Sequence, residues 1–240
     1  MSFPFDAILF DCDGVLVDSE VVGLEDAAAY LSGHGFAWTT EDFIRRFSGM
    51  RYDRFAAGLR EAYGQILGRD ADEREFEELI DGLIETRRAK RHTMTLVTGT
   101  EDLLRMVQGL PGVRIAVASS SGQAFLDDKI DRYGLRPVFG QHVYSADHVS
   151  HGKPAPDIFL FAATRLGVAA ERCLVIEDSA HGVAAGVAAE ATVWGFTGGG
   201  HCLPDHAEAL IDAGAERVFA THEQLTDEFT NLLSRREAAT

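Results

Sequence analysis

The chain has 240 residues, 46% hydrophobic and 25% charged, a balance that suits one or two globular domains with a sizeable core and excludes extended disorder. Its 22 basic against 38 acidic residues give a net charge of −16, which argues against nucleic acid or an anionic membrane as a partner. With no apolar run of membrane-spanning length and no signal-peptide pattern, we expect a cytoplasmic protein that is a monomer or weak homodimer.

Short apolar runs recur along the chain and alternate with helical patterns. The first run, residues 5–11, ends in acids, as a buried parallel strand does where it reaches an active-site edge. Later strands are predicted at residues 114–119, 142–144, 173–177, 192–196 and 217–219, and helices at 122–133 and 156–166. This alternation predicts a doubly wound parallel α/β sheet, whose ligand site lies outside the carboxyl ends of its strands.

Between the first two strands the sequence shows helical patterns and no strand pattern. The candidate helices are residues 20–31, 40–47, 52–63 and 72–91, and glycines separate them. We therefore expect an inserted α-helical bundle at 19–94 that caps the sheet's carboxyl edge. Residues 1–18 and 95–240 form the core domain in this interpretation.

The densest chemical signal, Asp-Cys-Asp-Gly-Val-Leu-Val-Asp-Ser, begins at Asp11 directly after the first strand. Gly14 permits the turn out of the sheet, so Asp11 and Asp13 can face one cavity. Their mutual repulsion would be relieved by a divalent cation. One carboxylate can attack phosphorus while the other moves protons. A solvated acidic turn or a calcium loop is the alternative interpretation of this motif taken alone.

Three further features follow later strands. Hydroxyls and helix-start amides at Ser119 and Ser120 can hold phosphate oxygens. Lys153 stands between a glycine and a proline and can neutralise phosphate charge. Glu177 and Asp178 end the fourth strand and can complete a magnesium shell of hard oxygen ligands. Each feature alone could be a helix cap or a surface turn, but a doubly wound fold brings all of them to one edge.

These motifs, taken in order along nearly the whole chain, resemble those of the haloacid dehalogenase superfamily. The helical insertion resembles the cap of its β-phosphoglucomutase-like and sugar-phosphatase branch. By this resemblance Asp11 is the nucleophile and Asp13 the general acid/base. Ser119 would bind phosphate, and Lys153 would neutralise its charge.

The same resemblance implies a magnesium ion held by Asp11, the carbonyl of Asp13 and Asp178, with Glu177 contacting these ligands rather than the ion. Additional phosphate contacts are expected from Gln123 and from the backbone amides near Cys12, Asp13 and Ser120. The implied activity is magnesium-dependent hydrolysis of a small phosphorylated metabolite, a sugar phosphate or sugar-acid phosphate, through an aspartyl-phosphate. Asp13 favours phosphate esters over the halide and phosphonate substrates of other branches.

Three alternatives stay open. A β-phosphoglucomutase would carry a histidine twelve residues after the nucleophile, where this chain has Gly23, although His34 could substitute for it. A phosphoryl-accepting signalling module has a similar acidic cluster but needs no inserted cap and about half this length. A catalytically silent relative would bind phosphorylated ligands without turning them over.

Substrate choice is expected to depend on the cap, because cap closure decides which side chains reach the cleft. The segment 43–52 is the predicted specificity loop, with Arg45, Gly49 and Arg51 facing the substrate. A second loop, residues 198–206, contains histidines and Cys202 but lacks a usual zinc spacing, which favours a plain flexible loop. The three cysteines have unrelated spacings and are expected to be reduced thiols.

Overall fold

The computed structural model of the chain describes residues 3–237. A six-stranded sheet forms its centre, in the order β3-β2-β1-β4-β5-β6, and every neighbouring pair is parallel. The strands are β1 (Ala7–Phe10), β2 (Arg114–Ser119), β3 (Val143–Ser145), β4 (Cys173–Glu177), β5 (Thr192–Phe196) and β6 (Arg217–Phe219). Each strand falls on an apolar run identified in the sequence, and the predicted doubly wound fold class is confirmed.

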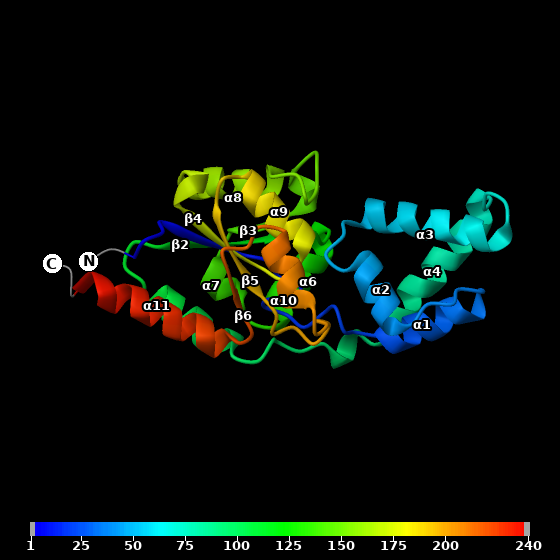
Figure 1. Cartoon of the computed structure of the whole chain (residues 1–240), viewed down its shortest axis with the longest axis horizontal. Coiled ribbons are helices and arrows are strands. Elements are labelled where there is room, and N and C mark those ends of the chain that lie inside the picture. Colours follow the sequence, from blue (N-terminus) through cyan, green and yellow to red (C-terminus); the bar gives the residue numbers. More distant parts are fainter. Residues whose placement is uncertain (1–2, 238–240) are drawn as a thin grey trace.

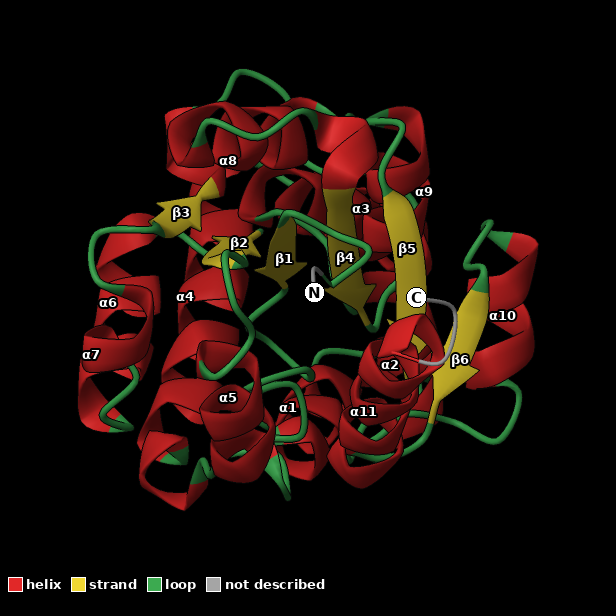
Figure 2. Cartoon of the chain, turned by 90° about the vertical axis from the view of Figure 1, so that its left-hand side faces the viewer, coloured by secondary structure: helices red, strands yellow, loops and turns green. Residues whose placement is uncertain are grey.

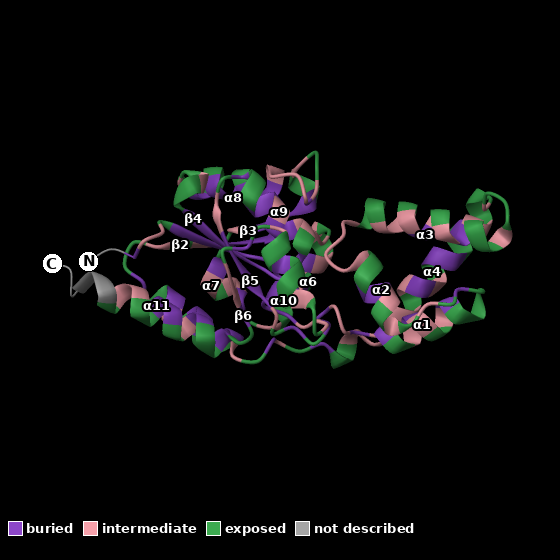
Figure 3. Cartoon of the chain, viewed as in Figure 1, coloured by how far each residue is buried: buried purple, intermediate pink, exposed green. Residues whose placement is uncertain are grey.

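Helices cover both faces of the sheet, which Figure 2 shows between two helical layers. Alternate residues of β1 point to opposite faces, so that Ile8 and Phe10 enter one hydrophobic cluster while Ala7 and Leu9 enter the other. The first face is covered by α5 (Thr100–Gln108), α6 (Gln123–Arg132), α7 (Arg136–Phe139) and α11 (His222–Glu237). The second is covered by α8 (Asp157–Leu166), α9 (Ala180–Ala188) and α10 (His206–Asp212). The strands are accordingly buried almost throughout (Figure 3).

The insertion between β1 and β2 is a helical bundle with a hydrophobic core of its own, on the right in Figure 1. Its helices are α1 (Leu24–Gly33), α2 (Thr40–Phe47), α3 (Tyr52–Leu67) and α4 (Glu73–Ala89). Side chains cap two of them: Thr39 and Asp42 form a capping box at α2, and Asp72 accepts from the amide of Glu75 at α4. Short 3-10 turns follow at Arg91–Thr93, Ala146–His148 and Ala170–Arg172.

The two connections between bundle and sheet run side by side. Val17 and Leu96 form an antiparallel bridge, and the amide of Asp18 donates to the carbonyl of Thr95 at 2.9 Å. A paired crossing is a natural hinge between two cores, and we propose the domain boundaries 18/19 and 94/95 there. Within residues 3–237, none of the helices has the length and apolar character that a membrane crossing requires.

Two cap helices differ by four residues at one end from their predicted limits, whereas the helix predicted at 72–91 is only slightly shorter, Glu73–Ala89. The helix expected at 20–31 begins only at Leu24, because Gly23 has a φ of 64° and a left-handed residue cannot continue the helix backward. The helix expected at 52–63 continues to Leu67 and ends at Gly68, whose φ of 68° provides the left-handed C-cap. The late start of α1 leaves Ser19 and Glu20 outside the helix, where both line a cavity at the carboxyl ends of the strands.

Candidate active site

Asp11 lies directly after β1, where the chain turns back on itself. Its Oδ2 accepts a hydrogen bond from the amide of Asp13 at 2.8 Å, which fixes the carboxylate over the turn. Gly14 has a φ of 80°, and a Cβ there would lie 1.8 Å from Oδ2 of Asp178. The glycine of this motif therefore serves two purposes, because it allows the turn and leaves room for a carboxylate from the neighbouring strand end.

Lys153 connects three of the strand ends. Its side chain is 2% exposed, and Nζ donates to Oδ1 of Asp11 at 2.5 Å, to the Ala118 carbonyl at 3.0 Å and to Glu177. Burial raises the pKa of Asp11 well above its usual range, Lys153 opposes that rise, and the nearby carboxylates of Glu177 and Asp178 add to it. Despite the cost of burying its charge, the two acids raise the pKa of Lys153. The lysine is thus a fixed cation beside the expected nucleophile.

The carboxylate of Asp13 has partners different from those of Asp11. It accepts hydrogen bonds from Ser119 Oγ at 3.1 Å, from Ser121 Oγ at 2.8 Å, and from Ser19 and Lys129. Although burial acts in the opposite direction, Lys129 and these hydroxyls lower the pKa of Asp13 to about 2. While these donors hold it, Asp13 is ionised and a weak base. It can carry a proton only after it turns away from them toward a substrate.

Lys129 is a residue that sequence reasoning missed. It lies on α6, is completely buried, and donates to Ser121 Oγ at 3.0 Å as well as to Asp13. The available signal was its position three residues after Leu126 and next to Ile130, on the apolar stripe of an amphipathic helix. A lysine on such a stripe requires a buried acidic partner, and Asp13 is that partner.

Replacing Lys129 with methionine should destabilise the fold by about 3 kcal/mol, because it leaves the buried carboxylate of Asp13 without its countercharge. Urea denaturation of the purified variant measures this change. The matched control is Lys90→Met, whose ion pair with Asp26 is about half exposed and should contribute roughly 0.5 kcal/mol or less. Equal stability of the two variants would show that the buried pair contributes no more than the exposed one.

The end of β4 supplies two acids with different partners. Glu177 is occupied by Lys153 and by Ser179, whose amide and hydroxyl donate to it at 2.8 and 3.0 Å. Asp178 is 3% exposed, and its Oδ2 lies 3.2 Å from Nε2 of His201. Burial raises the pKa of Asp178 to about 6, although His201 opposes the rise. Asp178 thus lines the cavity while it is paired with His201, whereas Glu177 is held by Lys153 and Ser179 and is not part of the lining.

A cavity of about 360 Å³ separates these strand ends from the cap. The core contributes Asp11, Asp13, Ser120, Lys153 and Asp178 to its lining. Its opposite wall consists of cap and hinge residues: Phe43, Phe47, Gly49, Met50, Tyr52, Phe55, Arg87, Arg88 and Arg91. A ligand in this cavity would meet the carboxylates and lysine at one end and the cap at the other.

Of the remaining predicted site residues, some line the cavity and others do not. Ser119, the predicted phosphate binder, is buried, its Oγ donates to Asp13, and it is not part of the cavity lining. Ser120 lines the cavity instead, and its Oγ has no hydrogen-bond partner within the part of the chain that the structure describes. The Cys12 side chain is buried in the core, so that only its backbone can serve a ligand. The side chain of Gln123 donates to Asp127 at 2.9 Å and is not part of the cavity lining.

The two cap arginines also lie away from the cavity lining. Arg45 forms ion pairs with Glu41 and with Asp205 of the core, at 2.8 and 2.9 Å. Arg51 pairs with Asp53 at 2.9 Å. Arg87, Arg88 and Arg91 from the end of α4 and the turn after it line the cavity instead, and the sequence analysis assigned them no substrate role.

Gly49 brings the cap backbone against the core. It has a φ of 74°, lines the cavity, and a Cβ there would lie 2.5 Å from the Cβ of Ser179. We expect Gly49→Ala to push the cap outward and to lower kcat/KM by about 100-fold, because small displacements of positioning groups are amplified in the rate. Steady-state kinetics test this, with Gly33→Ala as the control, since a Cβ at Gly33 meets no atom within 4 Å. Unchanged kinetics in Gly49→Ala would mean that the cap does not close on Ser179.

Comparison with known proteins agrees with this geometry. The model of the haloacid dehalogenase-like hydrolase family matches residues 5–190. A phosphorylated carbohydrates phosphatase of Thermotoga maritima is 31% identical over 220 residues, which covers 92% of this chain and 96% of that protein. The fructose-1-phosphate phosphatase YqaB of Escherichia coli is 31% identical over 185 residues, covering 76% and 91%. Two relatives from Arabidopsis thaliana are longer proteins, 36% and 33% identical to this chain over the matched regions. The chain spans only 17% of the length of the first and 46% of the length of the second.

Solved structures extend the likeness to the whole chain. A hydrolase of Deinococcus radiodurans with bound phosphate and sodium superposes with a TM-score of 0.74 at 35% identity, covering 96% of this chain and 97% of that one. A structure described as a putative β-phosphoglucomutase from Bacteroides vulgatus gives a TM-score of 0.75 at 26% identity, covering 97% and 90%. The match over residues 5–190 and the relatives that are 31% identical show that the chain belongs to the haloacid dehalogenase-like hydrolase family.

Proposed function

We propose that the chain hydrolyses a small phosphorylated sugar or sugar acid through an aspartyl-phosphate on Asp11, with magnesium as cofactor. The observation that carries the proposal is the contact of Asp11 with the buried Lys153 at the mouth of a cap-covered cavity. A nucleophile that attacks an anionic phosphate needs a neighbouring cation. The chain as a whole, with a net charge of −16, does not attract an anionic substrate, so a local cation has to do so. The free thiols fit a reducing, cytoplasmic setting.

The donor set of the cavity suits magnesium. Asp11 and Asp178 offer carboxylate oxygens, and Asp13 offers its backbone carbonyl, which are the hard ligands that magnesium prefers. Glu177 is held by Lys153 and Ser179 and would act only on these ligands. Bound there, magnesium would neutralise phosphoryl oxygens and the crowded carboxylates. The room that Gly14 leaves for Asp178 supports this assignment.

The chain's own residues carry out two displacements. In the first, an Oδ of Asp11 forms a bond to phosphorus, the P–O ester bond breaks, and Asp13 gives a proton to the leaving oxygen. In the second, water forms a bond to phosphorus while Asp13 takes its proton, and the aspartyl–phosphate bond breaks to release inorganic phosphate. To reach the substrate, the Asp13 carboxylate rotates away from its contacts with Ser121 and Lys129. Lys153 and the Ser120 hydroxyl hold phosphoryl oxygens throughout.

The size of the cavity and the relatives support a small substrate. About 360 Å³ is at the low end of the range for small-molecule sites, which suits a monosaccharide phosphate better than a macromolecule. Two relatives are described as phosphatases of phosphorylated carbohydrates and of fructose 1-phosphate. Arg87, Arg88 and Arg91 on the cap side could contact a second anionic group, such as the carboxylate of a sugar acid.

Phosphate release tests this function directly. The purified chain is incubated with p-nitrophenyl phosphate and with a panel of sugar phosphates, phosphorylated sugar acids, polyol phosphates and nucleotides. We expect continuous turnover, fastest with a sugar phosphate or sugar-acid phosphate. A signalling module would accept at most one phosphoryl group per chain, and a silent relative would release none, so either result would overturn the proposal.

Magnesium removal should abolish turnover. Asp11, Asp13, Glu177 and Asp178 otherwise place several negative charges beside an anionic phosphate. The measurement is phosphate release after exhaustive EDTA treatment, with metal content checked by elemental analysis and activity restored by added magnesium. Full activity in a preparation free of metal would contradict the proposed cofactor.

A further inference from the structure

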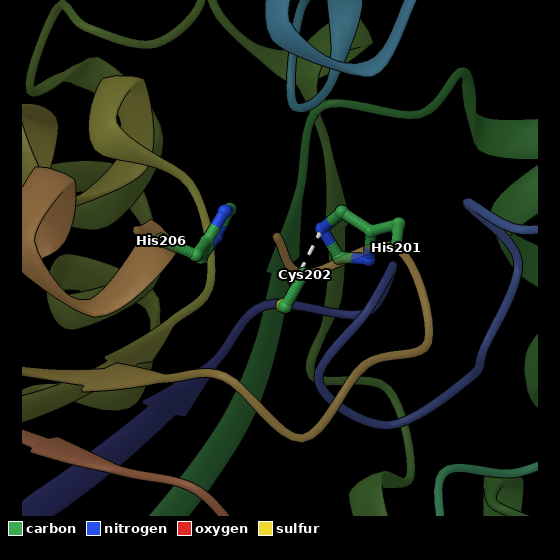
Figure 4. A group of neighbouring side chains, drawn as sticks. All are labelled: His201, Cys202 and His206. Carbon is green, nitrogen blue, oxygen red and sulfur yellow. Dashed lines mark hydrogen bonds between the residues drawn. The ribbon is translucent and has the colours of Figure 1, made fainter. Parts of the chain in front are cut away.

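Beside the proposed magnesium ligands, the structure gathers three side chains of a different kind. His201 and Cys202 lie in the loop after β5, and His206 begins α10. One ligand atom from each lies within 4.8 Å of those of the other two, and Nε2 of His201 is 3.9 Å from Sγ of Cys202. Figure 4 shows the contact between His201 and Cys202, with His206 facing them from the start of its helix. Two imidazoles and a thiol are the ligands that zinc and similar cations prefer.

Asp178 contacts both histidines of this cluster. Its Oδ2 is 3.2 Å from Nε2 of His201, and its carbonyl oxygen lies 2.5 Å from Nε2 of His206. His201 is 2% exposed, and its Nδ1 is buried without a hydrogen-bond partner within residues 3–237. Cys202 is only partly buried, so that an ion from solvent can reach the thiol. The cluster thus has an entrance on one side and a carboxylate on the other.

The loop is held in this position from two directions. The amide of Gly200 donates to Oδ1 of Asp18 at 3.0 Å, which ties the loop to the end of the nucleophile motif. Asp205 forms an ion pair with Arg45 of the cap at 2.9 Å. In a tetrahedral zinc site, bond lengths of ~2.0 Å to nitrogen and ~2.3 Å to sulfur put these two ligand atoms about 3.5 Å apart. The observed 3.9 Å therefore requires only a small adjustment.

We propose that His201, Cys202 and His206, with the Asp178 carboxylate as fourth ligand, form an inhibitory site for a thiophilic divalent cation of the zinc class. Binding releases to solvent the thiol proton of Cys202 and the imidazolium proton that His201 holds against Asp178, and it forms a metal–thiolate bond and metal–imidazole bonds with no change in oxidation state. The inhibition rests on the proposed function, in which Asp178 also binds magnesium. Because one carboxylate cannot serve both ions fully, zinc-class binding weakens magnesium binding, and magnesium weakens it in return.

The site was not evident from the sequence, because adjacent ligands at 201 and 202 followed by one at 206 do not match a usual zinc spacing. The fourth ligand comes from the end of β4, more distant in the chain. The loop that was interpreted as a plain flexible loop lies, in three dimensions, against Asp178, one of the proposed magnesium ligands. Its ligands are soft, whereas those of the proposed magnesium site are oxygen atoms, so the two sites select different ions.

Cobalt(II) is the probe that tests the site without turnover. Cobalt bound through a thiolate in a tetrahedral site gives intense visible bands and a near-ultraviolet charge-transfer band, whereas cobalt on oxygen ligands absorbs weakly. Titrating the purified chain, with magnesium in excess, should produce these bands at one cobalt per chain, and zinc should remove them. Cys202→Ser should lose the charge-transfer band, and His206→Gln should weaken cobalt binding by about 100-fold. The control, Cys173→Ala, alters a buried thiol of another region and should keep the spectrum.

The inhibitory role has a separate measurement. Phosphate release at fixed magnesium should fall as zinc is added, and raising magnesium should restore it. In Cys202→Ser the zinc concentration for half inhibition, relative to that variant's own uninhibited rate, should rise by about 100-fold. Absence of the charge-transfer band, or its persistence in Cys202→Ser, overturns the site. Cobalt bands with undiminished phosphate release overturn the inhibition, and bands in a chain without phosphatase activity would instead contradict the proposed function.

Discussion

Asp11→Asn should lower kcat by a factor of about 10⁴ or more, because an amide cannot attack phosphorus and the variant has no substitute at the end of β1. The change is nearly isosteric, so the amide of Asp13 still finds an oxygen acceptor. The contact with Lys153 becomes uncharged on one side, but Glu177 continues to pair with the lysine. We therefore expect a folded protein that binds substrate and does not turn it over.

Asp13→Asn should fail at a different step. It keeps the nucleophile and removes the group that handles protons, so attack with a good leaving group such as p-nitrophenolate can proceed without an acid. Hydrolysis of the aspartyl-phosphate then lacks its base. The variant should accumulate a labelled phosphoenzyme while releasing little inorganic phosphate.

Rapid acid quenching with radiolabelled phosphate ester distinguishes the two variants. Label should remain on the Asp13→Asn chain and be missing from the Asp11→Asn chain. Asp81→Asn, an exposed position of α4, serves as a control and should behave as the unaltered protein. Label trapped on Asp11→Asn would reverse the assigned roles of the two acids.

The positions of the strand ends could be predicted because they depend on local pattern and on one rule of topology. Apolar runs mark the strands, and parallel strands in a doubly wound sheet end at one edge, so Asp11, Lys153 and Asp178 had to lie near one another. The partners of these residues were not predictable in the same way. Lys129 reaches Asp13 and His201 reaches Asp178 only because of how α6 and the loop after β5 pack on the core.

In the cap, too, the helices could be predicted from the sequence but the partners of the side chains could not. Its helices follow from periodicity and capping residues such as Thr39 and Asp72. The direction in which each arginine side chain points does not follow from the sequence pattern, because it depends on which acidic residue lies within reach after the helices have packed. Arg45 finds Asp205, which is 160 residues away in the chain, and so lies outside the cavity lining. Gly49 is different, since its role depends on backbone approach rather than on a side-chain partner.

A mutase is the remaining rival to a hydrolase, and the structure around Gly23 bears on it. The β-phosphoglucomutases that this chain resembles carry a histidine at this position, which couples substrate binding to proton transfer. Gly23 has a φ of 64°, and a Cβ there would lie 3.1 Å from the Cα of Arg87. A histidine would therefore need both a strained backbone and a displaced α4.

No nearby residue of α1 replaces that histidine. His34 caps the opposite end of the helix, about 16 Å along its axis from Gly23. Its ring contacts Tyr30, and its Nδ1 lies 2.9 Å from the Tyr30 carbonyl. In this arrangement of the cap, His34 therefore does not occupy the place of that histidine.

Without that coupling, water should reach the aspartyl-phosphate before a sugar hydroxyl does. Incubation with β-glucose 1-phosphate and a trace of glucose 1,6-bisphosphate should release inorganic phosphate at least about 100-fold faster than glucose 6-phosphate forms, a difference of roughly 2.7 kcal/mol between the two barriers. The bisphosphate should act as a substrate or inhibitor and not as an activator, because the chain does not need to be primed for hydrolysis. Both products are measured in one reaction by enzyme-coupled assays, with a known mutase as the positive control. Glucose 6-phosphate forming faster than phosphate would make the chain a mutase despite Gly23, since proton transfer would then have to be controlled by a group other than a linker histidine.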